Sequence, residues 1–113
     1  MCGIFGIFSN KPVANSILKG LSKLEYRGYD SSGLSILESK NKIITIRAKG
    51  KLENLSNKTK HHDLLGTVGI GHTRWATHGI PSTDNAHPHS SEDVSIVHNG
   101  IIENYSTLKK MLK

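Results

Sequence analysis

Apolar positions in the first quarter of the chain predict a strand that leads into an amphipathic helix. Residues 3–8 are an almost continuous apolar run that contains Gly6, which is typical of a strand that is buried on both faces or closely approached by another segment. Asn10 can cap a helix and Pro12 suits a first turn, and apolar residues then recur at helical spacing: Val13, Ile17, Leu18, Leu21 and Leu24. We therefore expect a strand over 3–8, with Cys2 directly before its first residue, and a helix over about 12–26.

The middle of the chain predicts a hairpin followed by a glycine-spaced strand. Gly28 ends the helix, and two apolar stretches over 34–38 and 43–48 flank a polar turn. Residues 52–60 are polar and weakly helical. Glycines surround the apolar residues of the stretch 64–74, as in a strand whose backbone another segment approaches. We expect residues 72–77 to lie at the end of this strand.

The last third predicts a long loop and a terminal helix. Residues 78–93 are polar and irregular, and such loops carry function disproportionately. Apolar residues return over 94–97. A final apolar stripe has helical spacing and ends in lysines that complement the helix dipole; it consists of Ile101, Ile102, Tyr105, Leu108 and Leu112.

Composition narrows the function classes. With 113 residues the chain is expected to form one domain at most, and its longest apolar runs are far below the roughly 20 residues that span a bilayer. No secretory leader is recognisable, so we expect a cytoplasmic location and no membrane partner. A single cysteine excludes an internal disulfide and a cysteine-rich zinc site. The net charge of +6 comes mainly from scattered lysines, which a solvated surface explains, so no nucleic-acid partner is expected.

Cys2 occupies a position with distinctive chemistry. Removal of the initiator methionine ahead of a small residue would leave Cys2 with a free α-amino group. That amine titrates near pH 7.7 to 8.0 and a free thiol near 8.5, so the amine, directly or through a water, can accept the thiol proton. N-terminal threonine nucleophiles are activated in the same way. Taken alone, however, a lone cysteine beside an apolar strand is more typical of a small buried residue.

Cys2 belongs to the first of five sequence motifs that follow one another along the chain. They are residues 1–4 (Met-Cys-Gly-Ile), 27–33 (Arg-Gly-Tyr-Asp-Ser-Ser-Gly), 72–79 (His-Thr-Arg-Trp-Ala-Thr-His-Gly), 85–89 (Asn-Ala-His-Pro-His) and 98–104 (His-Asn-Gly-Ile-Ile-Glu-Asn). Together they resemble the class II glutamine amidotransferases, which are N-terminal-nucleophile hydrolases. The residue sequences of the second and third motifs resemble those of the enzymes that transfer nitrogen to fructose 6-phosphate. They are less similar to the motifs of the purine or asparagine enzymes.

The resemblance implies roles for single residues. Cys2 would attack the side-chain amide of L-glutamine, and Asn99 and Gly100 would stabilise the oxyanion. Arg74 would clamp the substrate carboxylate, a task that suits a planar guanidinium. Arg27 would support the oxyanion side near the nucleophile, and Trp75 would close the route of ammonia. Thr77 and His78 would surround the bound glutamine.

Other interpretations of these residues remain open at this point. Viewed alone, Arg74 is more typical of a surface ion pair, and Trp75 of an ordinary core aromatic residue. Together, and in the order of the motifs, the two residues favour the substrate-site interpretation. His87 and His89 have the alternate spacing of a metal site, but no nearby carboxylate pair or cysteine completes it. We expect no metal and no cofactor.

The resemblance also implies a larger architecture. The family fold is a four-layer αββα sandwich, of which residues 1–113 match about the first half, with the aspartate that holds the substrate amino group in the part not matched. The uncovered strands are expected to expose a sheet face and to make the chain weakly stable or associating. A sugar phosphate acceptor on a separate synthase domain and a homo-oligomeric parent are implied. Two alternatives are a different acceptor, such as phosphoribosyl pyrophosphate, and an inactive fragment that serves as an interaction module.

Overall fold

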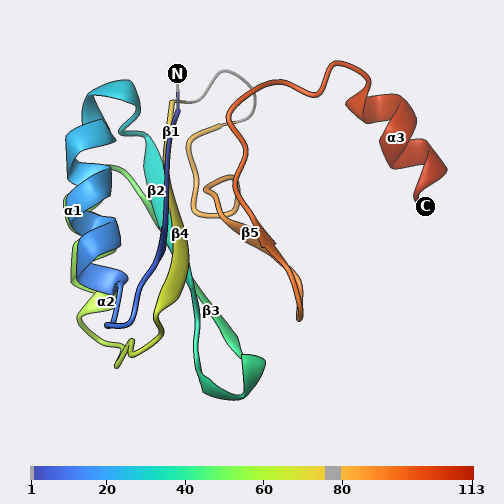
Figure 1. The fold of residues 1–113 in the computed structure, drawn as a ribbon. Coiled ribbons are helices and arrows are strands. Elements are labelled where there is room, and N and C mark those ends of the chain that lie inside the picture. Colours follow the sequence, from blue (N-terminus) through green and yellow to red (C-terminus); the bar gives the residue numbers. More distant parts are fainter. Residues whose placement is uncertain (1, 76–79) are drawn as a thin grey trace.

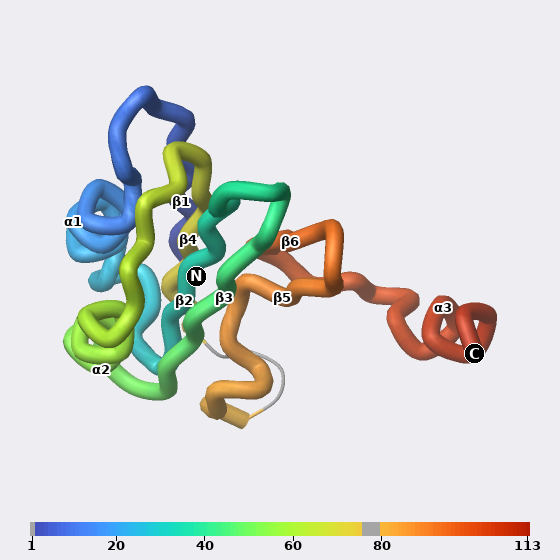
Figure 2. Tube along the Cα trace, turned by 90° about the horizontal axis from the view of Figure 1, so that it is seen from below, coloured from blue at the N-terminus to red at the C-terminus, as the bar shows by residue number. Residues whose placement is uncertain are grey.

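A computed structural model of the chain describes residues 2–75 and 80–113. Its centre is an antiparallel sheet with the strand order β1 (Gly3–Phe8), β4 (Val68–Arg74), β2 (Ser31–Leu37) and β3 (Ile43–Lys49). Helices α1 (Ala14–Leu24) and α2 (Leu52–Thr59) cover one face of this sheet (Figure 1). A small hairpin of β5 (His89–Ser90) and β6 (Ser95–Ile96) lies on the other side, and α3 (Tyr105–Met111) extends away from it (Figure 2). The predicted mixed α/β class is confirmed.

The hydrophobic core lies between α1, α2 and the sheet. Its fully buried members come from the helices and from β2, and they include Val13, Ile17, Leu21, Leu34, Ile36 and Leu55. On β4, an added Cβ at Gly69 or at Gly71 would lie 2.6 Å from the Ile17 side chain. The glycine spacing of this strand therefore lets α1 approach its backbone, as the sequence predicted.

Helix α1 begins later than the sequence predicted. Its N-cap residue is Val13, which makes no side-chain cap, so Asn10 and Pro12 both precede the helix. The backbone N–H groups of Ser9 and Val13 instead donate to carbonyls of the segment 66–67 that enters β4. This pairing holds the chain out of the helix up to residue 13. Beyond Leu24 a 3₁₀ turn, Glu25–Arg27, continues the helix to the boundary that was predicted.

Strand β1 is an edge strand, and of the two alternatives that its sequence left open, burial on both faces is wrong. Close approach by another segment is observed at Gly3, where an added Cβ would lie 2.8 Å from Leu24 Cβ of α1. Gly3 is buried and Phe5 and Ile7 pack toward α1, whereas Ile4 and Phe8 are 44% and 85% exposed. The physical reason is that, within residues 2–75 and 80–113, no layer covers the outer face of this strand. The exposure agrees with the expectation of an uncovered sheet face.

The predicted hairpin of β2 and β3 is confirmed, with altered boundaries. Its turn contains Lys40 and Asn41 at φ values of 60° and 58°. Strand β2 starts at Ser31 rather than at residue 34, because residues 31–33 pair with the end of β4 despite their polarity. Strand β4 in turn starts at Val68 rather than at residue 64.

The segment 78–93, predicted as a loop, contains a short strand that the sequence did not reveal. Strand β5 pairs with β6, and four hydroxyl groups fasten this hairpin to the main sheet. They belong to Ser35 of β2, Thr45 of β3, Ser90 of β5 and Ser95 of β6, and neighbouring oxygens lie 2.6 to 2.8 Å apart in a closed ring. Each hydroxyl can donate one hydrogen bond and accept another, so the ring satisfies all four groups.

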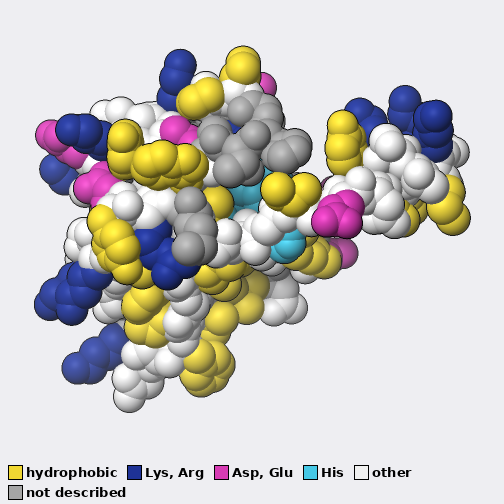
Figure 3. All heavy atoms as spheres, turned by 90° about the horizontal axis from the view of Figure 1, so that it is seen from above, with side chains coloured by type: hydrophobic (Ala, Val, Ile, Leu, Met, Phe, Trp, Pro, Cys, Tyr) yellow, Lys and Arg dark blue, Asp and Glu magenta, His cyan; other side chains and the backbone are white. Residues whose placement is uncertain are grey.

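The terminal helix is shorter than the predicted stripe. Only Tyr105–Met111 is helical, and all residues from 99 to 113 are exposed. Figure 3 shows this segment standing apart from the body of the molecule with hydrophobic and basic side chains on it. The apolar residues predicted for one helix face are therefore present without a partner in the described part of the chain.

Candidate active site

Cys2 lies directly before β1, where the loop after β6 crosses it. The Cys2 backbone N–H donates to Asn99 Oδ1 over 3.3 Å, and Asn99 Nδ2 donates to the Cys2 carbonyl over 3.2 Å. The two residues are 97 positions apart in the sequence. The carboxamide of Asn99 is therefore fixed against the backbone of the candidate nucleophile.

Arg27 donates to the same carbonyl as Asn99 does. At the end of the 3₁₀ turn, its Nε donates to the Cys2 carbonyl over 3.2 Å. The thiol itself is oriented toward the Trp75 carbonyl, with Sγ and O 4.0 Å apart. Cys2 is thus positioned through its backbone by two side chains, while its sulfur stays half-buried at the start of the strand.

Arg74 reaches the site from the last position of β4. Its Nη1 forms an ion pair with the Asp30 carboxylate 3.9 Å away and donates a hydrogen bond to the Ile80 carbonyl over 3.3 Å. Arg74 is only 8% exposed, so its charge is held in one place by partners from two loops. Such a buried, oriented guanidinium suits the binding of a carboxylate.

The glycine of the second motif allows two of these segments to meet. A Cβ at Gly28 would lie 2.5 Å from the Arg74 carbonyl carbon and 2.7 Å from the Trp75 nitrogen, so only glycine fits there. The next residue, Tyr29, packs edge-to-face on Trp75 with ring centroids 5.5 Å apart. Trp75 is nevertheless 46% exposed and is not an ordinary core residue.

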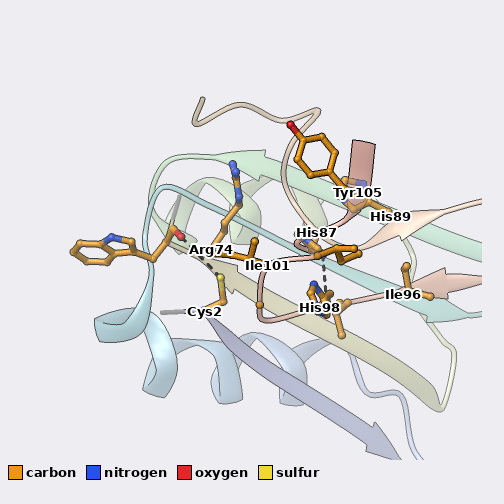
Figure 4. Close-up of a pocket in the computed structure, with 12 residues that line it drawn as sticks. Cys2, Arg74, His87, His89, Ile96, His98, Ile101 and Tyr105 are labelled. Carbon is orange, nitrogen blue, oxygen red and sulfur yellow. Dashed lines mark hydrogen bonds between the residues drawn. The ribbon is translucent and has the colours of Figure 1, made fainter. Parts of the chain in front are cut away.

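A large open pocket of about 840 Å³ unites these groups. Cys2 enters it from the start of β1 and Arg74 from the end of β4, and Figure 4 shows both beside Ile101 and the neighbouring histidines. The described lining consists of Cys2, Arg74, Trp75, His87, His89, Ile96, Val97, His98, Gly100, Ile101, Ile102 and Tyr105. None of these described lining residues is a carboxylate, so a substrate amino group finds no anionic partner among them.

Three histidines are in contact with one another beside the pocket. His72 is fully buried and stacks on His87 with ring centroids 4.2 Å apart, and His87 meets His89 at 4.5 Å. Burial lowers the pKa of His72 and that of His87 to about 4, and it also lowers the pKa of His89. The His72 and His87 rings are therefore neutral at physiological pH.

The structure brings together most of the predicted site residues that it describes. Cys2, Arg74, Trp75 and Gly100 line the pocket, whereas Asn99 and Arg27 contact Cys2 outside the lining. Thr77 and His78 lie outside the described residues. The sequence interpretation assigned no role to His72 and considered His87 and His89 only as metal ligands. The position of His72 within the third motif was the one available signal.

Two further findings concern the described part of the chain only. Within residues 2–75 and 80–113, no group of three or more histidine, cysteine or acidic side chains could hold a metal ion. In the same ranges, each helix is too short or too polar to cross a membrane.

Comparison with known structures identifies the fold. No protein-family model matches the chain. The fold matches that of glutamine phosphoribosylpyrophosphate amidotransferase from B. subtilis over 99% of this chain and 24% of that one, with a TM-score of 0.81 and 24% identity. The chain therefore shares its fold with the matched part of that amidotransferase.

Sequence relatives are more specific. Proteins named glutamine–fructose-6-phosphate aminotransferase (isomerizing) match all of this chain, with 52% identity in Buchnera aphidicola, 55% in Gluconobacter oxydans and 56% in Clostridium acetobutylicum. The predicted resemblance to class II glutamine amidotransferases, in the fructose-6-phosphate branch, is thereby confirmed. The chain spans 19% of the length of each of these three relatives.

Proposed function

We propose that residues 1–113 are the N-terminal portion of a glutaminase domain, which in the complete protein supplies ammonia for the conversion of fructose 6-phosphate to glucosamine 6-phosphate. The observation that carries this proposal is the reciprocal hydrogen bonding of Cys2 and Asn99 beside a pocket that Cys2 and Arg74 line. The names of relatives that match the whole chain support the same reaction. The substrates are then L-glutamine and a sugar phosphate, the latter on a separate domain.

The first chemical step requires removal of Met1. The Cys2 nitrogen then becomes an α-amine whose N–H still faces Asn99 Oδ1, the acceptor 3.3 Å away. This contact would orient the amine so that its lone pair can take the thiol proton, directly or through a water. Nucleophile and base thus belong to one residue.

The thiolate then attacks the amide carbon of glutamine and forms an S–C bond, and the carbonyl π electrons move onto oxygen. One N–H of Asn99 Nδ2 is engaged by the Cys2 carbonyl, which leaves its second N–H for the oxyanion, together with the Gly100 backbone. The C–N bond breaks as the α-ammonium returns the proton, so ammonia leaves. Water then hydrolyses the thioester to glutamate and the free thiol.

The other predicted residues receive supporting roles in this proposal. Arg74 binds the substrate α-carboxylate from its fixed position beside Asp30. Arg27 keeps the Cys2 backbone in place through its hydrogen bond to the carbonyl. Trp75 closes the ammonia route, and Thr77 and His78 surround the glutamine. We further propose a cytoplasmic location, because phosphorylated sugars do not cross membranes freely. A homo-oligomeric parent is proposed from the family resemblance alone.

A nitrogen-transfer assay tests the proposed function. The polypeptide that carries this chain at its full natural length is given glutamine with either fructose 6-phosphate or phosphoribosyl pyrophosphate, and glutamate and the aminated product are measured. We expect glutamate and glucosamine 6-phosphate in equal amounts with the first acceptor and no product with the second. Product only with the second acceptor would change the branch. Absence of glutamate with either acceptor would leave the interaction-module alternative.

A further inference from the structure

The turn that bears the oxyanion donors is held by two stacked imidazole rings. The residue before Asn99 is His98, and both polar groups of its backbone are engaged. Its carbonyl lies 2.9 Å from His72 Nε2, and its N–H donates to His87 Nδ1 over 3.3 Å. Because His72 and His87 stack on each other, the two contacts form one unit that fixes the backbone entering the turn.

The contacts dictate the protonation of each ring. A carbonyl only accepts hydrogen bonds, so His72 must carry its proton on Nε2, and His87 must present an unprotonated Nδ1 to the His98 N–H. The other nitrogen of His72, Nδ1, is buried and has no hydrogen-bond partner. A charged ring would place an unpartnered N–H there, which is far more costly than a bare lone pair. His72 is thus a neutral donor and is unsuited to act as a base.

A buried polar side chain with one unpartnered atom costs stability that an apolar residue would not. His72 occupies a central strand that is paired on both sides, and it does not line the pocket. On the neighbouring strand, Gly33 lies opposite His72, and a Cβ there would come 2.1 Å from the His87 carbonyl oxygen. The absent side chain leaves room for the His87 backbone to lie on the sheet and for the two rings to stack.

We propose that His72 is a positioning residue for glutamine hydrolysis, which holds the His98 carbonyl and thereby aims Asn99 and the Gly100 N–H at the developing oxyanion. This inference rests on the proposed glutaminase function. His72 touches no substrate and acts through the backbone of the turn. Its effect belongs to the transition state, because the oxyanion forms only there.

Three substitutions of His72 distinguish the role of its Nε2 hydrogen-bond donor from the role of ring stacking. In His72→Gln the side-chain amide nitrogen can reach the place of Nε2, whereas in His72→Asn it reaches only the place of Nδ1. His72→Phe keeps an aromatic ring for stacking and has no donor. His61→Gln serves as the matched control, since His61 is exposed and follows α2, which covers the opposite face of the sheet (Figure 1). Glutaminase kcat and KM are measured on the full-length protein and divided by the number of active sites titrated with an electrophilic glutamine analogue.

The expected result is a kcat effect with rescue. His72→Asn and His72→Phe should lower kcat per active site by about 10- to 100-fold, as a displacement of about 1 Å in catalytic geometry does, and leave KM for glutamine within about twofold. His72→Gln should stay within about fivefold of the unsubstituted protein, and His61→Gln should match it. If the Phe variant does not fold, the Gln and Asn pair alone decides.

Equal kcat per active site in His72→Gln and His72→Asn would overturn the inference, because the donor would then have no role beyond folding. A change in KM alone would overturn it as well, since that would indicate ground-state binding. Unsubstituted protein that forms no glutamate and no analogue adduct would instead overturn the proposed function and the inference with it. The two failures are therefore distinguishable.

Discussion

At the residue scale, the site depends on side chains that form hydrogen bonds with backbone carbonyls. Asn99 and Arg27 both bind the carbonyl of Cys2, and His72 binds the carbonyl of His98. The sequence predicted the first two residues near the nucleophile through motif resemblance. It could not predict the contact of His72, because a histidine in a strand pattern carries no sign of which distant carbonyl it faces.

Arg74 allows us to test whether the planar geometry of the guanidinium, and not only its positive charge, is needed for glutamine binding. Arg74→Lys keeps the charge but loses the planar fork, so KM for glutamine should rise about 10- to 100-fold, while kcat changes less. Reaction of Cys2 with a small neutral alkylating agent should stay within about twofold, because the nucleophile is untouched. Steady-state glutaminase kinetics and the alkylation rate of the full-length protein provide the check.

Arg47→Lys is the control for that substitution. Arg47 makes its hydrogen bonds to the carbonyls of Asp84 and Ala86 and does not line the pocket. It should leave KM within about twofold, as substitutions that remove no substrate contact do. An unchanged KM in Arg74→Lys would refute the proposed clamp.

At the element scale, strand β4 organises the site. Its α1 face carries glycines that admit the helix, and its other face carries His72 and Arg74. The apolar and glycine pattern predicted this strand, the hairpin and both principal helices within a few residues. The small hairpin β5–β6 was missed because each strand has two residues, too few for any periodicity, and because hydroxyl groups far apart in sequence fasten it.

The hydroxyl ring permits a prediction at this scale. Ser95→Ala removes one member, so Ser35 and Ser90 each lose a partner. Since part of the ring is exposed and water can replace a partner, the free energy of unfolding should fall by only about 1 kcal/mol. Chemical denaturation measures this difference, and hydrogen exchange should rise over residues 89–98.

Ser91→Ala provides the comparison, because Ser91 is exposed in the same hairpin and lies outside the ring. Its effect on the free energy of unfolding should stay within about 0.5 kcal/mol, as for ordinary surface substitutions. Equal effects of the two alanine variants would show that the ring adds no stability.

At the scale of the whole molecule, the fold collects three distant segments at one pocket. The sequence indicated this convergence only through resemblance, since residues 2, 74 and 99 share no local pattern. The exposed apolar side chains of β1 and the terminal segment, among them Phe8 at 85% and Leu112 at 86%, fit the expected uncovered face. That the chain alone is weakly stable or associates stays a prediction.

The pocket also indicates what the described residues lack. Its described lining contains no carboxylate for a substrate amino group. From the family resemblance, we expect the substrate amino group to be bound by an aspartate in the part of the domain that residues 1–113 do not match. The relatives, of which this chain spans 19%, are long enough to include such a segment.

The central claim is that Cys2 is the nucleophile of a glutamine-hydrolysing site, and covalent labelling tests it most directly. Full-length protein is treated with an electrophilic glutamine analogue and examined by intact-mass and peptide mass spectrometry, beside Cys2→Ser and a variant that retains an extra residue ahead of Cys2. We predict loss of Met1, one adduct on Cys2, protection by glutamine, and no adduct in either variant. Retained Met1 without an adduct, or an adduct that glutamine does not prevent, would contradict the account.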